Sequence, residues 1–133
     1  MNVVIVAFDK FTDIDVFLAW DLLNRVKFRH KDWNVKIVGT KPVHRSICGI
    51  DLPMHGDISE CNTADVVFFA SGKGAREVSK DKDYLQRFNL DPKRQIICSI
   101  CSGALLLAAL GHLDGITATT YPTAVEELKS YGV

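Results

Sequence analysis

IICSICSGALLLAALG, residues 96–111, joins an apolar run directly to a helical pattern, with no polar loop between them. The run that ends at Ile100 has the isoleucine-rich composition of a buried strand. The residues after Ser102 are mostly alanine and leucine, which favour a helix, and Gly111 stands where a helix commonly ends in a left-handed residue. This stretch therefore predicts a strand that turns sharply into a helix at Cys101.

The same succession of strand and helix continues on both sides of this stretch. Runs rich in β-branched residues predict three further buried strands and a short one, at residues 2–8, 34–40, 64–70 and 116–120. Apolar residues at helical spacing, with start and stop signals, predict helices at residues 12–26, 81–90 and 122–132, and a loop of small residues leads into another helix at 71–78. Strands that alternate with helices are typical of an α/β fold with a mostly parallel sheet covered on both faces.

Two segments allow more detailed predictions. The first helix has apolar residues at the spacing of an amphipathic helix, at Ile14, Phe17, Leu18, Leu22 and Val26. The segment from Lys41 to Glu60 contains two prolines and two glycines, which predict a long connection. Short hairpin strands are expected within it, around residues 46–48 and 51–54.

Composition limits the class of protein and its partners. A chain of 133 residues with 47% apolar residues is expected to form one domain with one core. Its formal net charge is zero and it has no run of like charges, which argues against nucleic acid or an anionic membrane and favours a small-molecule substrate. The N-terminal apolar run is too short for a signal peptide or a membrane span. We therefore expect a cytoplasmic protein whose four cysteines are thiols.

Cys101 is the first candidate for chemistry. Ligands of parallel α/β sheets bind beyond the carboxyl ends of the strands, and Cys101 stands at such an end. The first amides of the helix that follows point at this side chain, and their partial positive charge favours the thiolate. The amides of Ser102 and Gly72 are placed to form an oxyanion hole. The alternative is that Cys101 is a small buried apolar residue.

Cys98 forms a Cys-x-x-Cys pattern with Cys101, which raises a redox interpretation. If Cys98 lies within the strand, three extended residues separate the two Cα atoms by about 10 Å. A disulfide needs a separation of about 7 Å or less. The geometry therefore argues against a redox pair.

Asp15 is the predicted acidic partner of Cys101. It belongs to the beginning of the first helix and is surrounded by apolar neighbours, so burial is expected to favour its protonated form. A protonated carboxyl can donate a hydrogen bond to a thiolate or pass a proton to substrate. The alternative role, an acid that is only stabilised by the helix N-terminus, suits Asp13 better.

The histidines and the remaining cysteines do not form a predicted site. His112 is expected about 15 Å from Cys101 along the helix. The spacing of a zinc site is absent from His44, Cys48, His55 and Cys61. Ser-Gly-Lys-Gly at residues 71–74 also lacks the spacing of a phosphate-binding loop. We therefore expect no metal and no cofactor.

Four segments, in this order and spacing, resemble the DJ-1/PfpI superfamily, also called ThiJ/PfpI: VVIVAFDKFTDIDVFLAWDLL (3–23), ADVVFFASGKG (64–74), ICSGALLLAALGHLDG (100–115) and ATTYP (118–122). The first is most similar to isocyanide hydratases and to the amidotransferase-like domains of certain transcription regulators. The resemblance implies a flavodoxin-like three-layer sandwich of the class I glutamine amidotransferase type, which is usually a homodimer. It also implies that Cys101 is the nucleophile, Asp15 its acidic partner, and Gly72 and Ser102 the oxyanion amides.

Three features depart from the family pattern. The loop after the third strand, usually Pro-Gly-Gly-x-Gly, reads Ala-Ser-Gly-Lys-Gly at residues 70–74. Tyr121 stands where many members have histidine, and Ser102 stands where protease-like members have one, so peptidase or amidase chemistry through a Cys/His pair is not expected. Family members also continue with further strands and a closing helix, and residues 1–133 are expected to form a single domain without them.

These features lead to two main hypotheses. The first is an enzyme that acts on a small electrophile such as an isocyanide or a reactive carbonyl; Cys101 attacks, Asp15 manages the proton, and Tyr121 and Phe11 line the pocket. The second is a non-catalytic redox-sensing or stress-response protein in which Cys101 is oxidised to a sulfinate. A third, a regulatory ligand-binding domain, has no DNA-binding motif to support it.

Overall fold

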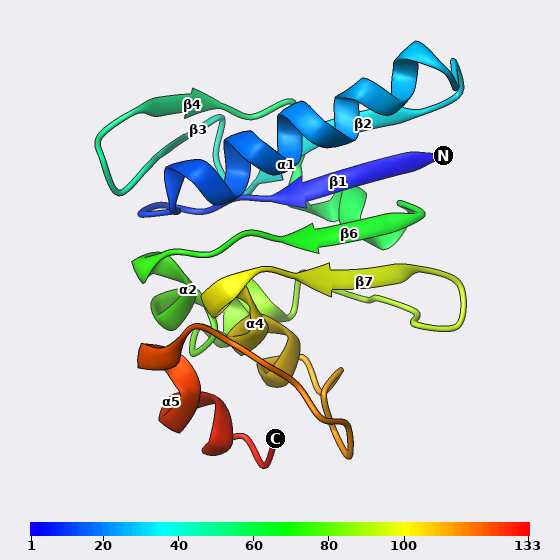
Figure 1. Cartoon of the computed structure of the whole chain (residues 1–133). Helices are drawn as coiled ribbons and strands as arrows, with labels where there is room; N and C mark the ends of the chain where they lie inside the picture. The colour runs from blue at the N-terminus through cyan, green and yellow to red at the C-terminus, as the bar shows by residue number, and fades with distance from the viewer.

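A computed structural model describes residues 1–133 and confirms the predicted α/β fold. Its main sheet has five strands, all parallel, in the order β5-β2-β1-β6-β7. The strands are β1 (Asn2–Val6), β2 (Asn34–Gly39), β5 (Gly56–Asp57), β6 (Val66–Phe69) and β7 (Ile96–Ser99). The arrowheads of β1, β6 and β7 point the same way in Figure 1, so the residues that follow these strands meet at one edge of the sheet.

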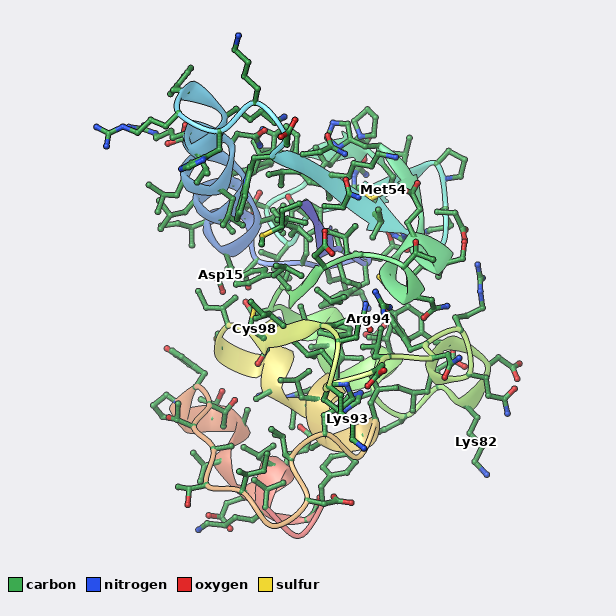
Figure 2. The ribbon with its side chains drawn as sticks, turned by 90° about the vertical axis from the view of Figure 1, so that its right-hand side faces the viewer. Asp15, Met54, Lys82, Lys93, Arg94 and Cys98 are labelled. Carbon is green, nitrogen blue, oxygen red and sulfur yellow. The ribbon has the colours of Figure 1, made fainter.

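Helices cover both faces of this sheet. The helical elements are α1 (Asp13–Arg25), η1 (Val26–Phe28), η2 (Ile58–Asn62), α2 (Lys73–Val78), α3 (Lys82–Leu85), η3 (Cys101–Gly103), α4 (Ala104–Ala109), η4 (Pro122–Ala124) and α5 (Val125–Lys129). The longest, α1, lies on one side of the strands and η2 on the other (Figure 2). None of these helices combines the length and the apolar character that crossing a bilayer requires.

Strand β1 is the centre of the core. It pairs with β2 on one side and with β6 on the other, and its residues from Val3 to Val6 are almost fully buried. A strand covered on both faces is apolar at successive positions rather than at alternate ones. The continuous apolar run that predicted this strand is therefore explained by its central place.

The predicted strand at residues 116–120 is not formed, and the fifth strand is β5 at the opposite edge of the sheet. Residues 116–120 make no ladder with β7, and Ile116 is exposed. The segment is tied to the molecule by a side chain instead, because the Thr120 hydroxyl donates to the Cys101 carbonyl at 2.8 Å. The prediction was wrong because it rested on the β-branched composition of residues 116–120 alone. A strand forms only where the segment also pairs with a neighbouring strand.

The long connection contains the predicted hairpin, as strands β3 (Val43–Arg45) and β4 (Asp51–Pro53) in a separate antiparallel sheet. The prediction of the first strand at residues 46–48 was wrong: β3 lies at residues 43–45, and residues 46–48 belong to the turn, in which Ser46 takes part. Its Oγ accepts from the Ile50 N–H at 2.9 Å, and its own N–H donates to the Ile50 carbonyl at 2.9 Å.

Helix α1 is apolar on two faces. Val16 faces the core and is fully buried, whereas Ile14, Leu18 and Leu22 are 64%, 49% and 53% exposed. These three are among the five residues that the helical spacing singled out, and the other two, Phe17 and Val26, are half-buried. The stripe formed by Ile14, Leu18 and Leu22 therefore lies on the outer surface of the molecule rather than against the sheet.

Candidate active site

A cavity of about 650 Å³ opens where β1, β6 and β7 end. It is lined by Thr12, Ile14, Asp15, Ile47, Gly72, Lys73, Arg76, Ile100, Cys101, Ser102, Tyr121 and Thr123. These residues come from the start of α1, the hairpin turn, the start of α2, the β7–α4 junction and the segment around Tyr121. The carboxyl edge of a doubly wound sheet is the usual place for a ligand. Five of the six predicted site residues line this one cavity.

Cys101 occupies the predicted sharp turn between β7 and α4. Its φ is +53°, a left-handed conformation that costs a residue other than glycine about 1–2 kcal/mol. The turn lies close against β6, since a Cβ at Gly103 would stand 2.7 Å from the carbonyl oxygens of Phe69 and Ala70. The small residue at 103 lets the backbone approach, and the strained turn presents the half-buried Cys101 thiol to the cavity.

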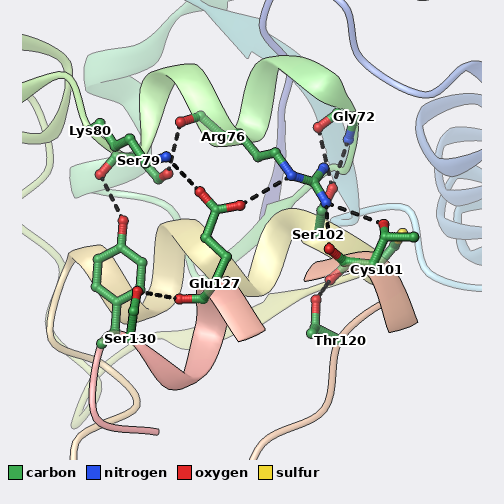
Figure 3. Close-up of polar contacts among 11 residues, drawn as sticks. Gly72, Arg76, Ser79, Lys80, Cys101, Ser102, Thr120, Glu127 and Ser130 are labelled. Atoms are coloured by element: carbon green, nitrogen blue, oxygen red, sulfur yellow. Dashed lines mark hydrogen bonds and ion pairs between the residues drawn. The ribbon is translucent and has the colours of Figure 1, made fainter. Parts of the chain in front are cut away.

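The two predicted oxyanion donors are neighbours, and one of them is already engaged. The Gly72 N–H donates to Ser102 Oγ at 3.1 Å, and Ser102 Oγ donates back to the Gly72 carbonyl at 3.3 Å (Figure 3). The Ser102 N–H, at the first turn after the strand, has no protein acceptor. Of these two donors, only the Ser102 amide is therefore free in this structure to receive negative charge beside Cys101.

Asp15 lines the same cavity as Cys101, in the first turn of α1. The hydroxyl of Ser71, which is fully buried, donates to Asp15 Oδ2. The other oxygen, Oδ1, has no protein partner. Ser71 thus holds the carboxyl in place, a role that the sequence reasoning missed although Ser71 directly precedes Gly72.

Tyr121 and Phe11, the two residues expected in the pocket, are placed differently. Tyr121 lines the cavity at its mouth and is 55% exposed. Phe11 is fully buried and does not line the cavity; its ring meets that of Phe17 edge-on, with centroids 6.1 Å apart. The backbone at Phe11 bridges to Gly72 on one side and to Ser46 on the other, which turns its side chain into the core. Phe11 therefore supports the loops around the cavity from beneath.

Cys98 lies inside β7, as the argument against a redox pair assumed. Its thiol donates to the Val67 carbonyl at 3.7 Å, and burial raises its pKa. Burial also raises the pKa of Cys61, to about 12. All four cysteines are free. Cys98 and Cys61 are thus poor thiolates.

Two cations of α2, Lys73 and Arg76, also line the cavity and were not predicted. Glu127 of α5 holds Arg76, with 3.1 Å between Arg76 Nε and Glu127 Oε2. Arg76 Nη2 donates to the carbonyl and the hydroxyl of Thr123, each at 3.2 Å (Figure 3). The sequence signal was weak, because Lys73 and Arg76 resemble any pair of charges on a surface helix.

No metal centre is formed. Nowhere do three or more histidine, cysteine, aspartate or glutamate side chains gather in a way that could hold an ion. His44 is buried and is hydrogen-bonded to Asp9, with 3.0 Å between Nδ1 and Oδ1. The polar groups that line the cavity are a thiol, a carboxyl, backbone amides and two cations.

Comparison with known proteins identifies a family and several solved structures that are similar to this chain. The whole chain, residues 1–133, matches the DJ-1/PfpI family. Three solved structures share the fold: a two-domain protein from Anabaena variabilis with DJ-1/ThiJ/PfpI-like and ferritin-like domains (14% identity, TM-score 0.81), Schizosaccharomyces pombe DJ-1 (18%, 0.79) and oxidized Toxoplasma gondii DJ-1 (19%, 0.78). No match was found among curated proteins.

The relatives are longer than this chain. The matches cover 98%, 99% and 95% of the chain, but only 38% of the Anabaena protein, 74% of the S. pombe protein and 70% of the T. gondii protein. At identities of 14–19%, the structural similarity establishes the fold but not the activity, which depends on the residues that line the cavity.

Proposed function

The chain belongs to the DJ-1/PfpI family, and we propose that it is a cysteine-dependent enzyme that acts on a small electrophile, an isocyanide or a reactive carbonyl. The observation that carries this proposal is the left-handed turn at Cys101, which exposes one thiol to a cavity that also contains Asp15 and the free Ser102 amide. Strained backbone of this kind is retained where function requires it.

The proposed reaction begins with attack by the Cys101 thiolate. With an aldehyde, the sulfur bonds to the carbonyl carbon, the π electron pair moves to oxygen, and Asp15 or water supplies a proton to give a hemithioacetal. With an isocyanide, the sulfur adds to the terminal carbon, which takes the proton, and water then displaces the sulfur to leave an N-formyl product. The Ser102 N–H stabilises the developing negative charge. Rotation of the Ser102 side chain about its Cα–Cβ bond moves Oγ away from Gly72 and frees the Gly72 N–H to serve as a second donor.

A redox-sensing role is the second candidate, and one observation favours it. The Ser102 N–H and the Asp15 Oδ1 both lack protein partners and border the cavity of Cys101. These groups suit the oxygens of a cysteine sulfinate as well as those of a reaction intermediate. A relative of the same fold is described as oxidized DJ-1. In this role two equivalents of peroxide oxidise the Cys101 thiolate through the sulfenate to the sulfinate, each peroxide giving one oxygen atom to sulfur and leaving as water, and the protein does not turn over.

The experiment that separates these roles measures thiol reactivity first and turnover second. Iodoacetamide at neutral pH should alkylate Cys101 faster than Cys98 and Cys61, whose pKa values are raised by burial. Peptide mass spectrometry reads all sites in one sample. Isocyanides and glyoxals are then screened with the wild-type protein and with Cys101→Ala. Turnover lost in Cys101→Ala supports the enzyme; a stable sulfinate after peroxide with no turnover supports the sensor; and an unreactive Cys101 contradicts both.

We also propose that the protein is a homodimer in a reducing, cytoplasmic compartment. The exposed stripe of Ile14, Leu18 and Leu22 provides an apolar surface suited to a second copy, and all four cysteines are free. Leu18→Glu should shift the sedimentation coefficient to that of a monomer. Ile96→Glu, at an apolar residue equally exposed on the edge strand β7, is the control that should leave the dimer intact.

A further inference from the structure

The cavity at Cys101 is lined by more cationic than anionic side chains. Its lining contains two cations, Lys73 and Arg76, and one carboxylate, Asp15. Oδ2 of that carboxylate is occupied by the Ser71 hydroxyl. Glu127, which does not line the cavity, offsets the charge of Arg76. Lys73 is therefore the cation of the lining whose charge has no protein partner.

Lys73 differs from the neighbouring lysines because it has no ion-pair partner. On the same side of the molecule, Lys10 pairs with Glu77 at 2.5 Å and Lys80 pairs with Glu127 at 2.7 Å. No acidic group lies within ion-pair distance of Lys73, and it is exposed at the start of α2. Its charge is therefore free to act on a molecule in the cavity.

Arg76 is held in one position, unlike Lys73. Glu127 and Thr123 bind its Nε and Nη2, and its Nη1 donates to no protein group. Arg76 lines the cavity together with Gly72, Cys101 and Ser102, which Figure 3 draws with it. A guanidinium held by Glu127 and Thr123 and an unpaired ammonium that line one cavity are suited to a carboxylate.

We propose that the electrophile accepted by this cavity carries a carboxylate, which Lys73 and Arg76 bind while Cys101 attacks the electrophilic carbon. The inference rests on the proposed function and specifies its substrate class, such as an aldehyde acid or an isocyanide with a carboxylate. The covalent step is unchanged: sulfur bonds to the carbon, and the carbonyl oxygen or the isocyanide carbon takes the proton. The two cations add binding and orientation without entering the reaction.

The test compares two alkylating reagents that differ in charge, iodoacetate and iodoacetamide. In both, the thiolate forms a C–S bond and iodide leaves, so the ratio of their rate constants at Cys101 reports the effect of the carboxylate alone. Lys73→Met should lower this ratio about three- to tenfold. High salt should lower the wild-type ratio in the same direction, because it screens the charges.

Lys82→Met is the matched control. Lys82 also begins a short helix, is exposed and has no ion pair, but it lies on the other side of the molecule from Asp15 (Figure 2). It should leave the ratio unchanged. The inference is overturned if Lys73→Met leaves the ratio at the wild-type value, or if Lys82→Met lowers it equally. If Cys101 reacts with neither reagent, the proposed function fails first, and this inference fails with it.

Discussion

Two polar clusters lie at the carboxyl edge of the sheet, and they differ in how many of their polar groups have protein partners. The first is centred on Asp9, just after β1. Its carboxylate accepts from the Nζ of Lys41, from Nδ1 of His44 at 3.0 Å and from the Arg45 N–H at 3.2 Å. Nε2 of His44 in turn accepts from the Lys41 N–H at 3.3 Å. This cluster is closed, since both ring nitrogens and both carboxylate oxygens are paired.

The second cluster, around Cys101, is open. The Ser102 N–H, the Asp15 Oδ1 and the Lys73 ammonium all lack protein partners and border one cavity. Cys101 itself adopts a left-handed conformation. Unpaired polar groups and backbone strain both cost stability.

The comparison teaches that similar residue types at one sheet edge serve different purposes according to their pairing. The closed cluster joins β1 to the hairpin of β3 and β4, and its hydrogen bonds contribute to folding. The open cluster retains hydrogen-bonding capacity that a bound molecule can use. Four substitutions can break or sharpen this distinction.

Cys101→Ala should have the largest effect, a loss of turnover of about a thousandfold or more, because it removes the proposed nucleophile. The companion variant Cys101→Gly should be equally inactive. It should also raise the free energy of unfolding by about 1 kcal/mol, since glycine accepts φ +53° without strain. Kinetics and urea denaturation measure the two effects. Retained turnover, or Cys101→Gly less stable than Cys101→Ala, would contradict a strained catalytic turn.

Gly72→Ala should lower the free energy of unfolding by about 3 kcal/mol or more. Gly72 has φ +145°, and a Cβ there would stand 2.2 Å from the Lys10 carbonyl oxygen and 2.7 Å from the Phe11 Cα. Gly49→Ala is the matched control, because Gly49 also has positive φ, at +94°, but has open space around it. It should cost only about 1 kcal/mol. Urea denaturation measures both variants. Equal losses in the free energy of unfolding would show that the close approach of Gly72 to Lys10 and Phe11 does not matter for stability.

Asp9→Asn should alter the pH dependence of stability. Burial alone would raise the pKa of Asp9, but the hydrogen bonds from Lys41, His44 and Arg45 outweigh it and lower the pKa from 3.8 to about 2. A lowered carboxyl pKa stabilises the folded state above pH 3.8, and this stabilisation is lost as the pH falls from 3.8 to about 2. Because the Asp9 side chain is 46% exposed, solvent screening limits the contribution to about 1 kcal/mol.

The wild-type protein should therefore be more stable than Asp9→Asn above pH 3.8, and this difference in the free energy of unfolding should disappear as the pH falls to about 2. Urea denaturation at several pH values measures it. Burial lowers the pKa of His44, so the neutral ring is favoured in the folded state and both proteins should lose stability as the pH falls below 6.5. A difference between the two proteins that stays constant down to pH 2 would show that Asp9 contributes no charge-dependent stability.

Thr120→Val should have the smallest effect, a loss of about 0.5–1 kcal/mol in the free energy of unfolding, because it removes one hydrogen bond to the Cys101 carbonyl. Thr119→Val is the control, since the exposed Thr119 side chain makes no hydrogen bond. Denaturation should show no change in the control. If the two variants behave alike, the Thr120 hydroxyl does not secure its segment to the open cluster.

The sequence alone predicted the parts of the fold that depend on local pattern. Continuous apolar runs identified the central strands, and the junction at Cys101 was predicted from an apolar run that meets a helical run without a loop. The predicted short strand at residues 116–120 was wrong, because β-branched residues describe only a local preference, and this segment does not pair with the free edge of β7.

Only the tertiary structure decided which polar groups are paired. It joined Ser71 to Asp15 and Ser102 to Gly72, turned Phe11 into the core, and left Lys73 without a partner. These contacts bring together residues far apart in the chain, so no periodicity reports them. Local pattern determines which elements form, because it depends on neighbouring residues; the chemistry of the cavity depends on distances across the sheet edge, which exist only after the chain has folded.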